Sequence, residues 1–267
     1  MKALALFLAL ASPATAAKIA PEALDVTTTF RGAQVVILGE IHDNPIHHGH
    51  QARAVAALQP KALVFEMLPE GVAMPASHDG SDDLAKALGW NTSGWPEFSM
   101  YYPIFAAAPA ARIYGAEVSR NTARRAFEQG VAAVFGADAA EYGLTERLPS
   151  DDQTAREAEQ ALAHCNALPP TLLPGMVDVQ RLRDAALARA VVQALADTGG
   201  PVAVITGTGH ARRDQGVPAV LARVAPNLPV LSIGQFEAAP APDAPFDLWL
   251  VTDPEPREDP CATLSKG

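Results

Sequence analysis

Short runs of apolar, mostly β-branched residues recur along this chain, and each run is uninterrupted rather than alternating with polar residues. Uninterrupted runs of about four to eight residues are typical of strands that are covered on both faces of a parallel sheet. Parallel neighbours need crossover connections, and segments of helical composition separate most of the runs. The predicted strands are residues 34–38, 62–65, 112–115, 202–206 and 229–233, with 247–251 as a candidate edge strand.

Helix signals lie between these strands. Asn44 followed by Pro45 is typical of an N-cap with proline in the first turn, and predicts a helix that runs to about residue 58. Two segments rich in Ala, Arg and Glu, 151–168 and 177–196, predict longer helices before the fourth strand. We therefore expect an α/β fold, a mostly parallel sheet flanked by helices, with an inserted helical and irregular subdomain.

Two regions, 74–109 and 119–196, are the predicted insertions of a single domain that spans 18–267. The first is rich in aromatic residues, glycine and proline, and such a segment is typical of either a binding surface or a small core that caps the sheet. The sequence leaves these two alternatives open.

Composition and the N-terminal residues limit the possible ligands and the cellular location. The chain has a net charge of −10, which disfavours binding to nucleic acid. Residues 1–17 combine Lys2, a short apolar run and small residues in an A-x-A pattern, which predicts a cleavable secretory signal and a periplasmic or secreted protein. A lipid-accepting cysteine is absent from the predicted cleavage site. In that compartment a disulfide between Cys165 and Cys261 is permitted but not required, so both states stay open.

The residues that end the predicted strands are acidic or histidine. The first strand leads into Gly39-Glu40-Ile41-His42, the second into Glu66, the third into Glu117 and the fourth into Gly207-Thr208-Gly209-His210. Because the carboxyl ends of parallel strands meet at one edge of a sheet, we expect these side chains to gather there. Imidazole with carboxylate suits a divalent metal or a general base, so Glu40, His42, Glu66 and His210 are the candidate metal-binding or catalytic residues.

Other polar groups are weaker candidates. His47, His48 and His50 fall at the start of the first predicted helix, where His47 and His50 share one face and His48 points elsewhere. A metal pair of His47 and His50 is one alternative, but we expect these two side chains to be solvated. Arginines such as Arg120 and Arg212 are typical of solvated faces, although they also suit an anionic ligand. Gly207-Thr208-Gly209 lacks the following Lys-Ser/Thr of a phosphate loop, and no G-x-S-x-G or H-E-x-x-H motif is present.

Several of these motifs together resemble the ChaN-like haem-binding uptake proteins. The resemblance covers residues 34–233 and is carried by the motifs at Ile37–Pro45, Phe65–Met67, Gly94–Phe98, Gly115–Asn121 and Ile205–His210. That family is similar to the Tiki metalloproteases and erythromycin esterases, which share the paired Gly-x-x-His turns.

The resemblance implies a secreted bacterial protein that binds haem for iron acquisition, with a membrane haem receptor and a second copy of the chain as partners. It implies a tyrosine on the haem iron, for which Tyr101 and Tyr102 are the candidates, and Arg120 and Arg212 near the propionates. The alternative is a metal-dependent hydrolase in which Glu40, His42, Glu66 and His210 hold a divalent metal or activate water.

Overall fold

The computed structural model describes residues 16–77, 80–259 and 261–262, so most of the predicted signal, residues 1–15, lies outside the described residues. An eight-stranded sheet forms the centre of the molecule, with the order β1-β8-β7-β2-β6-β3-β5-β4. All pairs are parallel except β4 with β5. The predicted α/β class is confirmed.

The predicted strands all appear, some with shifted ends. They are β2 (Val35–Glu40), β3 (Ala62–Pro69), β5 (Arg112–Glu117), β6 (Val202–Gly207), β7 (Val230–Phe236) and β8 (Leu248–Val251). Two short strands, β1 (Ala17–Lys18) and β4 (Ala73–Pro75), were not predicted. Because β1 pairs with β8, the prediction that 247–251 forms the edge strand is wrong.

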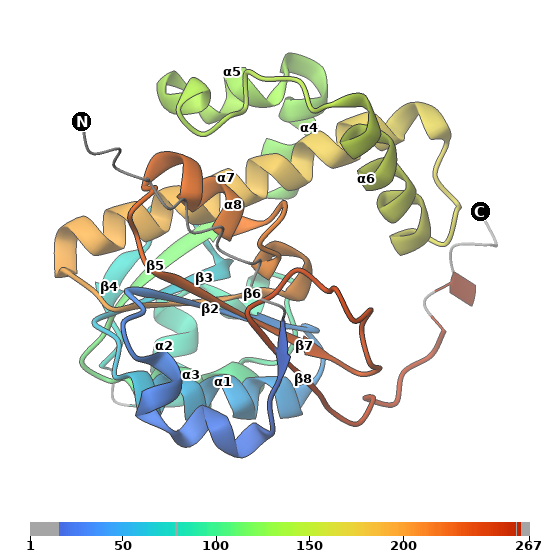
Figure 1. Cartoon of the computed structure of the whole chain (residues 1–267). Helices are drawn as coiled ribbons and strands as arrows, with labels where there is room; N and C mark the ends of the chain where they lie inside the picture. The colour runs from blue at the N-terminus through green and yellow to red at the C-terminus, as the bar shows by residue number, and fades with distance from the viewer. Residues whose placement is uncertain (1–15, 78–79, 260, 263–267) are drawn as a thin grey trace, which may run out of the picture.

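The central strands bury both faces, as their unalternating sequences predict. On one face Val36, Leu38 and Phe65 pack against α1 (Pro45–Leu58), α2 (Ser81–Ala87) and α3 (Phe98–Ala107). On the other face Val35, Ile37 and Val64 pack against a second layer of helices. Figure 1 shows this layer above the sheet, on the side opposite to α1, α2 and α3. That layer consists of α4 (Arg120–Gln129), α5 (Val131–Phe135), α7 (Leu173–Thr198) and α8 (Val217–Val224).

Short 3-10 helices complete the fold. They are η1 (Pro21–Asp25), η2 (Thr27–Phe30), η3 (Trp90–Thr92), η4 (Ala137–Ala140), η5 (Pro170–Leu172) and η6 (Thr208–Ala211). Within the described residues, no helix combines the length and hydrophobicity needed to cross a membrane.

The aromatic-rich region 74–109 contributes mainly to the core. Trp90, Phe98, Tyr101 and Phe105 are buried in the cluster that covers the α1 face of the sheet. Of the two alternatives for this region, the structure therefore supports a small core for these residues. Trp95 differs, because it is only half-buried and its ring lies against that of His42.

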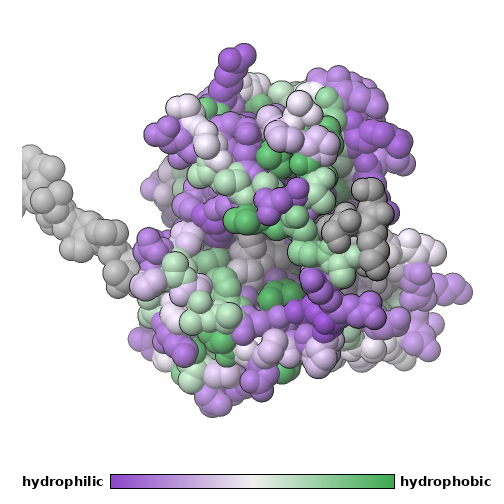
Figure 2. Space-filling model, turned by 90° about the vertical axis from the view of Figure 1, so that its right-hand side faces the viewer, coloured by the Kyte–Doolittle hydropathy of each residue, from purple (hydrophilic) through white to green (hydrophobic). Residues whose placement is uncertain are grey.

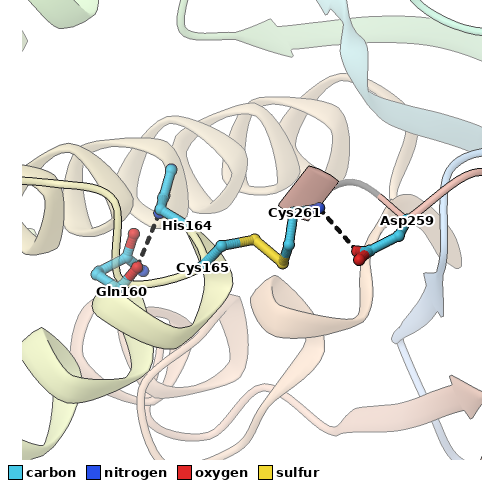
Figure 3. The surroundings of a disulfide bond; sticks show 5 residues. All are labelled: Gln160, His164, Cys165, Asp259 and Cys261. Atoms are coloured by element: carbon cyan, nitrogen blue, oxygen red, sulfur yellow. Dashed lines mark hydrogen bonds between the residues drawn. A yellow bond between two sulfur atoms is a disulfide. The ribbon is translucent and has the colours of Figure 1, made fainter. Parts of the chain in front are cut away.

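Helix α6 (Ser150–Ala163) stands apart from the core. It contains no buried residue, and it ends where Cys165 and Asn166 adopt positive φ values of 57° and 55°. A disulfide joins Cys165 to Cys261, so the C-terminal segment is tied to the end of α6 (Figures 1 and 3). The bond closes a loop with a sequence separation of 96, worth roughly 4 to 5 kcal/mol in a chain-entropy model.

Candidate functional site

The site lies at the carboxyl ends of the three central strands. The sheet order places β6 between β2 and β3, so Glu40 at the end of β2 and Glu66 in β3 flank the end of β6. The turn after β6 is the 3-10 helix η6, which carries His210 back toward the same edge. Glu40, His42, Glu66 and His210 therefore lie together, although 170 positions separate Glu40 from His210 in the chain.

Glu66 lies at the centre of this group. One carboxylate oxygen, Oε2, accepts hydrogen bonds from the Thr206 hydroxyl at 2.7 Å and from the Gly207 amide at 2.8 Å. The other oxygen, Oε1, lies 3.5 Å from His210 Nε2, while Oε2 lies 3.8 Å from His42 Nε2. Burial acts to raise the pKa of Glu66, but the two imidazoles and these hydrogen bonds hold it below its ordinary value. Glu66 is therefore ionised at neutral pH.

Glu40 orients the first imidazole. Its Oε1 lies 2.8 Å from His42 Nδ1 and also accepts a 2.7 Å hydrogen bond from the Tyr101 hydroxyl. Burial opposes ionisation of Glu40, but the hydrogen bond with His42 and the nearby His48 imidazole bring its pKa to about 2. The carboxylate in turn raises the pKa of His42 against the effect of burial.

A second carboxylate, which the sequence analysis did not identify, orients the second imidazole. Asp184 of α7 is buried, and its Oδ1 lies 2.7 Å from His210 Nδ1. Burial alone would lower the pKa of His210, but Glu66 and Asp184 raise it to about 9. The sequence contains a signal for Asp184, which is a charged residue on an apolar helix face. It follows Val177 by seven residues, so the two side chains lie on the same face of α7.

The two imidazoles therefore have the same arrangement. In each, a carboxylate contacts Nδ1 and leaves Nε2 directed toward Glu66. Carboxylates that hold one ring nitrogen in this way fix the tautomer and orientation of histidines that bind metals. Gly207 leaves room beside the first imidazole, since a Cβ there would lie 3.0 Å from His42 Nε2.

A groove runs over these groups, between the sheet edge and the helical layer. The part beside α6 has a volume of about 700 Å³ and includes Glu40, His42, Asp184 and His210. The part beside Trp95 has a volume of about 390 Å³ and shares His42 and His210 with the first. Figure 2 shows the molecule from the side and hollowed between its upper and lower halves.

The other predicted site residues are distributed unevenly. Arg120 and Arg212 both line the groove, and Arg212 is already paired with Glu159 and Asp214. Tyr101 is fully buried, and burial with the neighbouring Glu40 raises the pKa of its hydroxyl. Tyr102 is half-buried, and its ring lies 6.1 Å from that of Phe98. The structure thus brings the arginines to the groove and places Tyr101 behind Glu40.

Glu117, predicted at the same edge, also lines the groove. It is half-buried, and burial raises the pKa of its carboxyl although the neighbouring Trp95 side chain acts to lower it.

The prediction that His47 and His50 are solvated is wrong. His47, His48 and His50 are all buried, because β7 and the segment after β8 cover this end of α1. His47 Nδ1 accepts the Ile41 amide at 2.9 Å, and its Nε2 lies 2.9 Å from the Thr252 hydroxyl. His50 bonds to Gln235, and His48 Nε2 lies 3.6 Å from Glu40 Oε2.

The donor types at the strand ends, two imidazoles and a carboxylate, are ones that bind iron and divalent metals in proteins. In the part of the chain that the structure describes, no group of three or more His, Cys, Asp or Glu is arranged to hold a metal ion by itself. Metal binding by Glu40, His42, Glu66 and His210 therefore stays a prediction.

Comparison with known proteins identifies the family. A family model described as "Haem-binding uptake, Tiki superfamily, ChaN" matches residues 26–221. A solved structure of cofacial haem binding to ChaN of Campylobacter jejuni has 18% sequence identity and a TM-score of 0.59, and the match covers 85% of this chain and 88% of that one. The type III effector HopBA1 matches at 13% identity, over 85% of this chain and 92% of its own, with a TM-score of 0.42.

No curated protein matches the chain. The family model spans well over half of the sequence, and the ChaN structure shares the fold. The chain belongs to the ChaN-like haem-binding uptake family of the Tiki superfamily.

Proposed function

We propose that this protein binds haem in the groove, with the iron facing His42 and His210. The observation that carries this proposal is the pair of imidazoles, each held at Nδ1 by a carboxylate and each with its Nε2 facing an oxygen of the Glu66 carboxylate. Histidine is a common axial ligand of haem iron, and the porphyrin itself supplies the other four nitrogen donors. The site therefore offers the one or two protein ligands that haem requires.

The electrostatics of the site support a cation at this point. Glu40, Glu66 and Asp184 are buried carboxylates that favour positive charge on the two imidazoles. The same carboxylates favour a ferric centre, provided that a coordinating imidazole first loses its Nε2 proton. Haem binding should therefore release protons, and its affinity should rise with pH through the pKa range of the two histidines.

The proposal extends to a role in iron acquisition outside the cytoplasm. The secretory pattern in residues 1–17 supports export, and the Cys165–Cys261 disulfide is typical of an oxidising compartment. A periplasmic or secreted haem carrier needs a partner to deliver its cargo, so a membrane haem receptor and a second copy of the chain are the partners we propose. Detection of the processed protein in a periplasmic fraction, and its mass in solution, test this part.

Hemin titration tests the binding itself. Purified protein should shift the Soret band and saturate at a defined ratio of hemin to chain. His42→Ala and His210→Ala should each weaken the shift. Asp178→Asn, which neutralises a carboxylate on the exposed side of α7, should leave the shift unchanged. A titration without saturation would reject haem binding.

One observation favours a second candidate, a metal-dependent hydrolase. Glu66 lies between two imidazole Nε2 atoms, and a metal held there would lower the pKa of a bound water. Elemental analysis of protein purified without chelator should then find a divalent metal at about one per chain, lost in His42→Ala or His210→Ala. Protein free of metal, with no hydrolysis on addition of zinc or manganese, would eliminate this candidate.

A further inference from the structure

Helix α6 forms part of the groove wall but packs weakly on the rest of the molecule. Four of its residues line the 700 Å³ part of the groove, namely Arg156, Glu159, Gln160 and Ala163. No residue of α6 is buried, and Leu162 is 69% exposed. Because most helices in proteins are stabilised by packing of an apolar face, a helix without a buried face is held weakly in place.

A surface carboxylate links α6 to the residues that follow η6. Glu159 accepts hydrogen bonds of 2.9 Å from Arg212 and from Gln215, at the surface, where such contacts contribute little stability. Among the described residues, the two apolar clusters that cover the sheet include none from α6 and none from the C-terminal segment, 252–259 and 261–262. Helix α6 can therefore move without disrupting the core.

The disulfide attaches α6 covalently to the side of the groove that carries His42. Cys165 lies just beyond the end of α6, and Cys261 lies in the C-terminal segment, which runs along the side of the molecule to this point (Figures 1 and 3). In the same segment, the Arg257 Nε and Nη2 atoms donate hydrogen bonds of 2.9 and 2.8 Å to the Asp43 carboxylate. Asp43 directly follows His42, so the tether spans from one wall of the groove to the other.

The bond is accessible to a small reductant, since Cys165 and Cys261 are both only half-buried. A dithiol reduces such a bond by exchange, through a mixed disulfide. The S–S bond of the protein breaks and an S–S bond forms in the reductant. Two electrons and two protons pass from the dithiol to the cysteines, which become two thiols.

We propose that the Cys165–Cys261 disulfide is a redox-sensitive tether, which holds α6 over the groove and slows ligand exchange at His42 and His210. Reduction by a dithiol leaves the surface contacts of Glu159 and the packing of α6 beside α7 without covalent support. The inference rests on the proposed function for its ligand, haem. The movement of α6 rests on the contacts of the helix alone.

Hydrogen–deuterium exchange of the ligand-free protein tests the movement. Dithiothreitol should speed exchange of the 150–163 amides at least about tenfold, as expected when a covalent link no longer keeps two groups close, and should leave β2 and β6 unchanged. The double variant Cys165→Ser, Cys261→Ser should exchange like reduced wild type, with or without dithiothreitol. Asp259→Asn is the matched control, because its side-chain oxygen can still accept the Cys261 amide and the disulfide stays in place.

Hemin dissociation tests the effect on the ligand, with no reductant present to act on the iron. Transfer of hemin to an excess of apomyoglobin should be about tenfold faster from the double serine variant than from wild type or Asp259→Asn. Unchanged exchange in β2 and β6 shows that the variant is folded.

Equal deuterium exchange of α6 in the oxidised and reduced protein would overturn the tether. Faster exchange of β2 and β6 as well would assign the bond to the stability of the whole fold and would also overturn it. Faster exchange of α6 with an unchanged rate of hemin dissociation would overturn its control of the ligand. Faster exchange of α6 in a protein without a saturable hemin shift would reject the proposed function and support the movement of the helix.

Discussion

Two groups of histidines lie close together in this molecule but have opposite environments. His42 and His210 follow the ends of strands, contact a carboxylate through Nδ1 and keep their Nε2 atoms at the groove. His47, His48 and His50 lie on α1 and are buried under the C-terminal part of the sheet. The first group therefore lines the proposed site and the second packs in the core, where His48 also lies 3.6 Å from Glu40.

The pKa values express this difference. Neighbouring carboxylates raise the pKa of His42 and bring that of His210 to about 9, against the effect of burial. Burial dominates at His47 and lowers its pKa to about 4. A histidine beside an ionised carboxylate is prepared to hold a proton or a metal, whereas a buried histidine without such a contact stays neutral and acts as a hydrogen-bonding core residue.

The largest expected effect is on stability at His47. His47→Ala removes the acceptor for the Ile41 amide and the contact with Thr252, and it leaves a cavity. We expect a loss of about 3 kcal/mol in the free energy of unfolding, measured by urea denaturation. The folded fraction should keep its hemin affinity to within a few-fold. A loss below about 0.5 kcal/mol would contradict a structural role.

The two groups should also give opposite pH dependence of stability. The pKa of His47 is lower in the folded state, so its contribution is complete above about pH 6.5 and is lost as the pH falls toward 4. The pKa of His210 is higher in the folded state, so its contribution is complete below about pH 6.5 and is lost as the pH rises through 9.

The free energy of unfolding, measured between pH 4 and pH 10, should therefore depend less on pH in the acid range in His47→Gln. In His210→Gln it should depend less on pH in the alkaline range. The His47 contribution between pH 7 and pH 5 is about 2 kcal/mol. Identical slopes in both variants and wild type would refute the assignment.

A smaller effect concerns the carboxylate that orients His210. Asp184→Asn keeps an oxygen at hydrogen-bond distance but removes the charge, so the pKa of His210 should fall from about 9. Loss of such an outer contact typically weakens metal affinity 10- to 100-fold, and we expect about tenfold for hemin. NMR titration of the histidines measures the pKa of His210, and hemin absorption measures the affinity for hemin. Asp178→Asn on the same helix is the control.

The smallest effect separates histidine from tyrosine as the ligand. Tyr101→Phe removes a hydrogen bond to Glu40, which still contacts His42, and should cost about 1 kcal/mol of stability. Hemin binding should persist in Tyr101→Phe and in Tyr102→Phe. Loss of the hemin spectrum in either variant would instead assign the iron to that tyrosine.

The sequence predicted the sheet and the strand-end group because both depend on local patterns. Unbroken apolar runs identify buried strands, and the rule that parallel strands share a carboxyl edge brings Glu40, Glu66 and His210 together. Asn44 caps α1 as predicted, since its side chain accepts the Ile46 and His47 amides. These features need no knowledge of distant contacts.

The burial of the α1 histidines and the role of Asp184 depend on long-range contacts. His47 and His50 are covered by Thr252 and Gln235, which follow them by 205 and 185 residues. Asp184 becomes a site residue only because α7 crosses above the β6 turn that carries His210. A short sequence window contains no information on either contact, so a helix start rich in histidine predicts a solvated surface.

The double variant His42→Ala, His210→Ala tests the central claim most directly, by hemin absorption at fixed pH. Each single variant leaves one oriented imidazole, whereas the double variant leaves none while Tyr101, Tyr102 and the arginines remain. We predict that hemin affinity falls more than 100-fold, beyond the effect of outer-shell changes, and that the fold is retained by circular dichroism. A double variant that binds hemin with wild-type affinity and spectrum would show that the iron does not face these histidines.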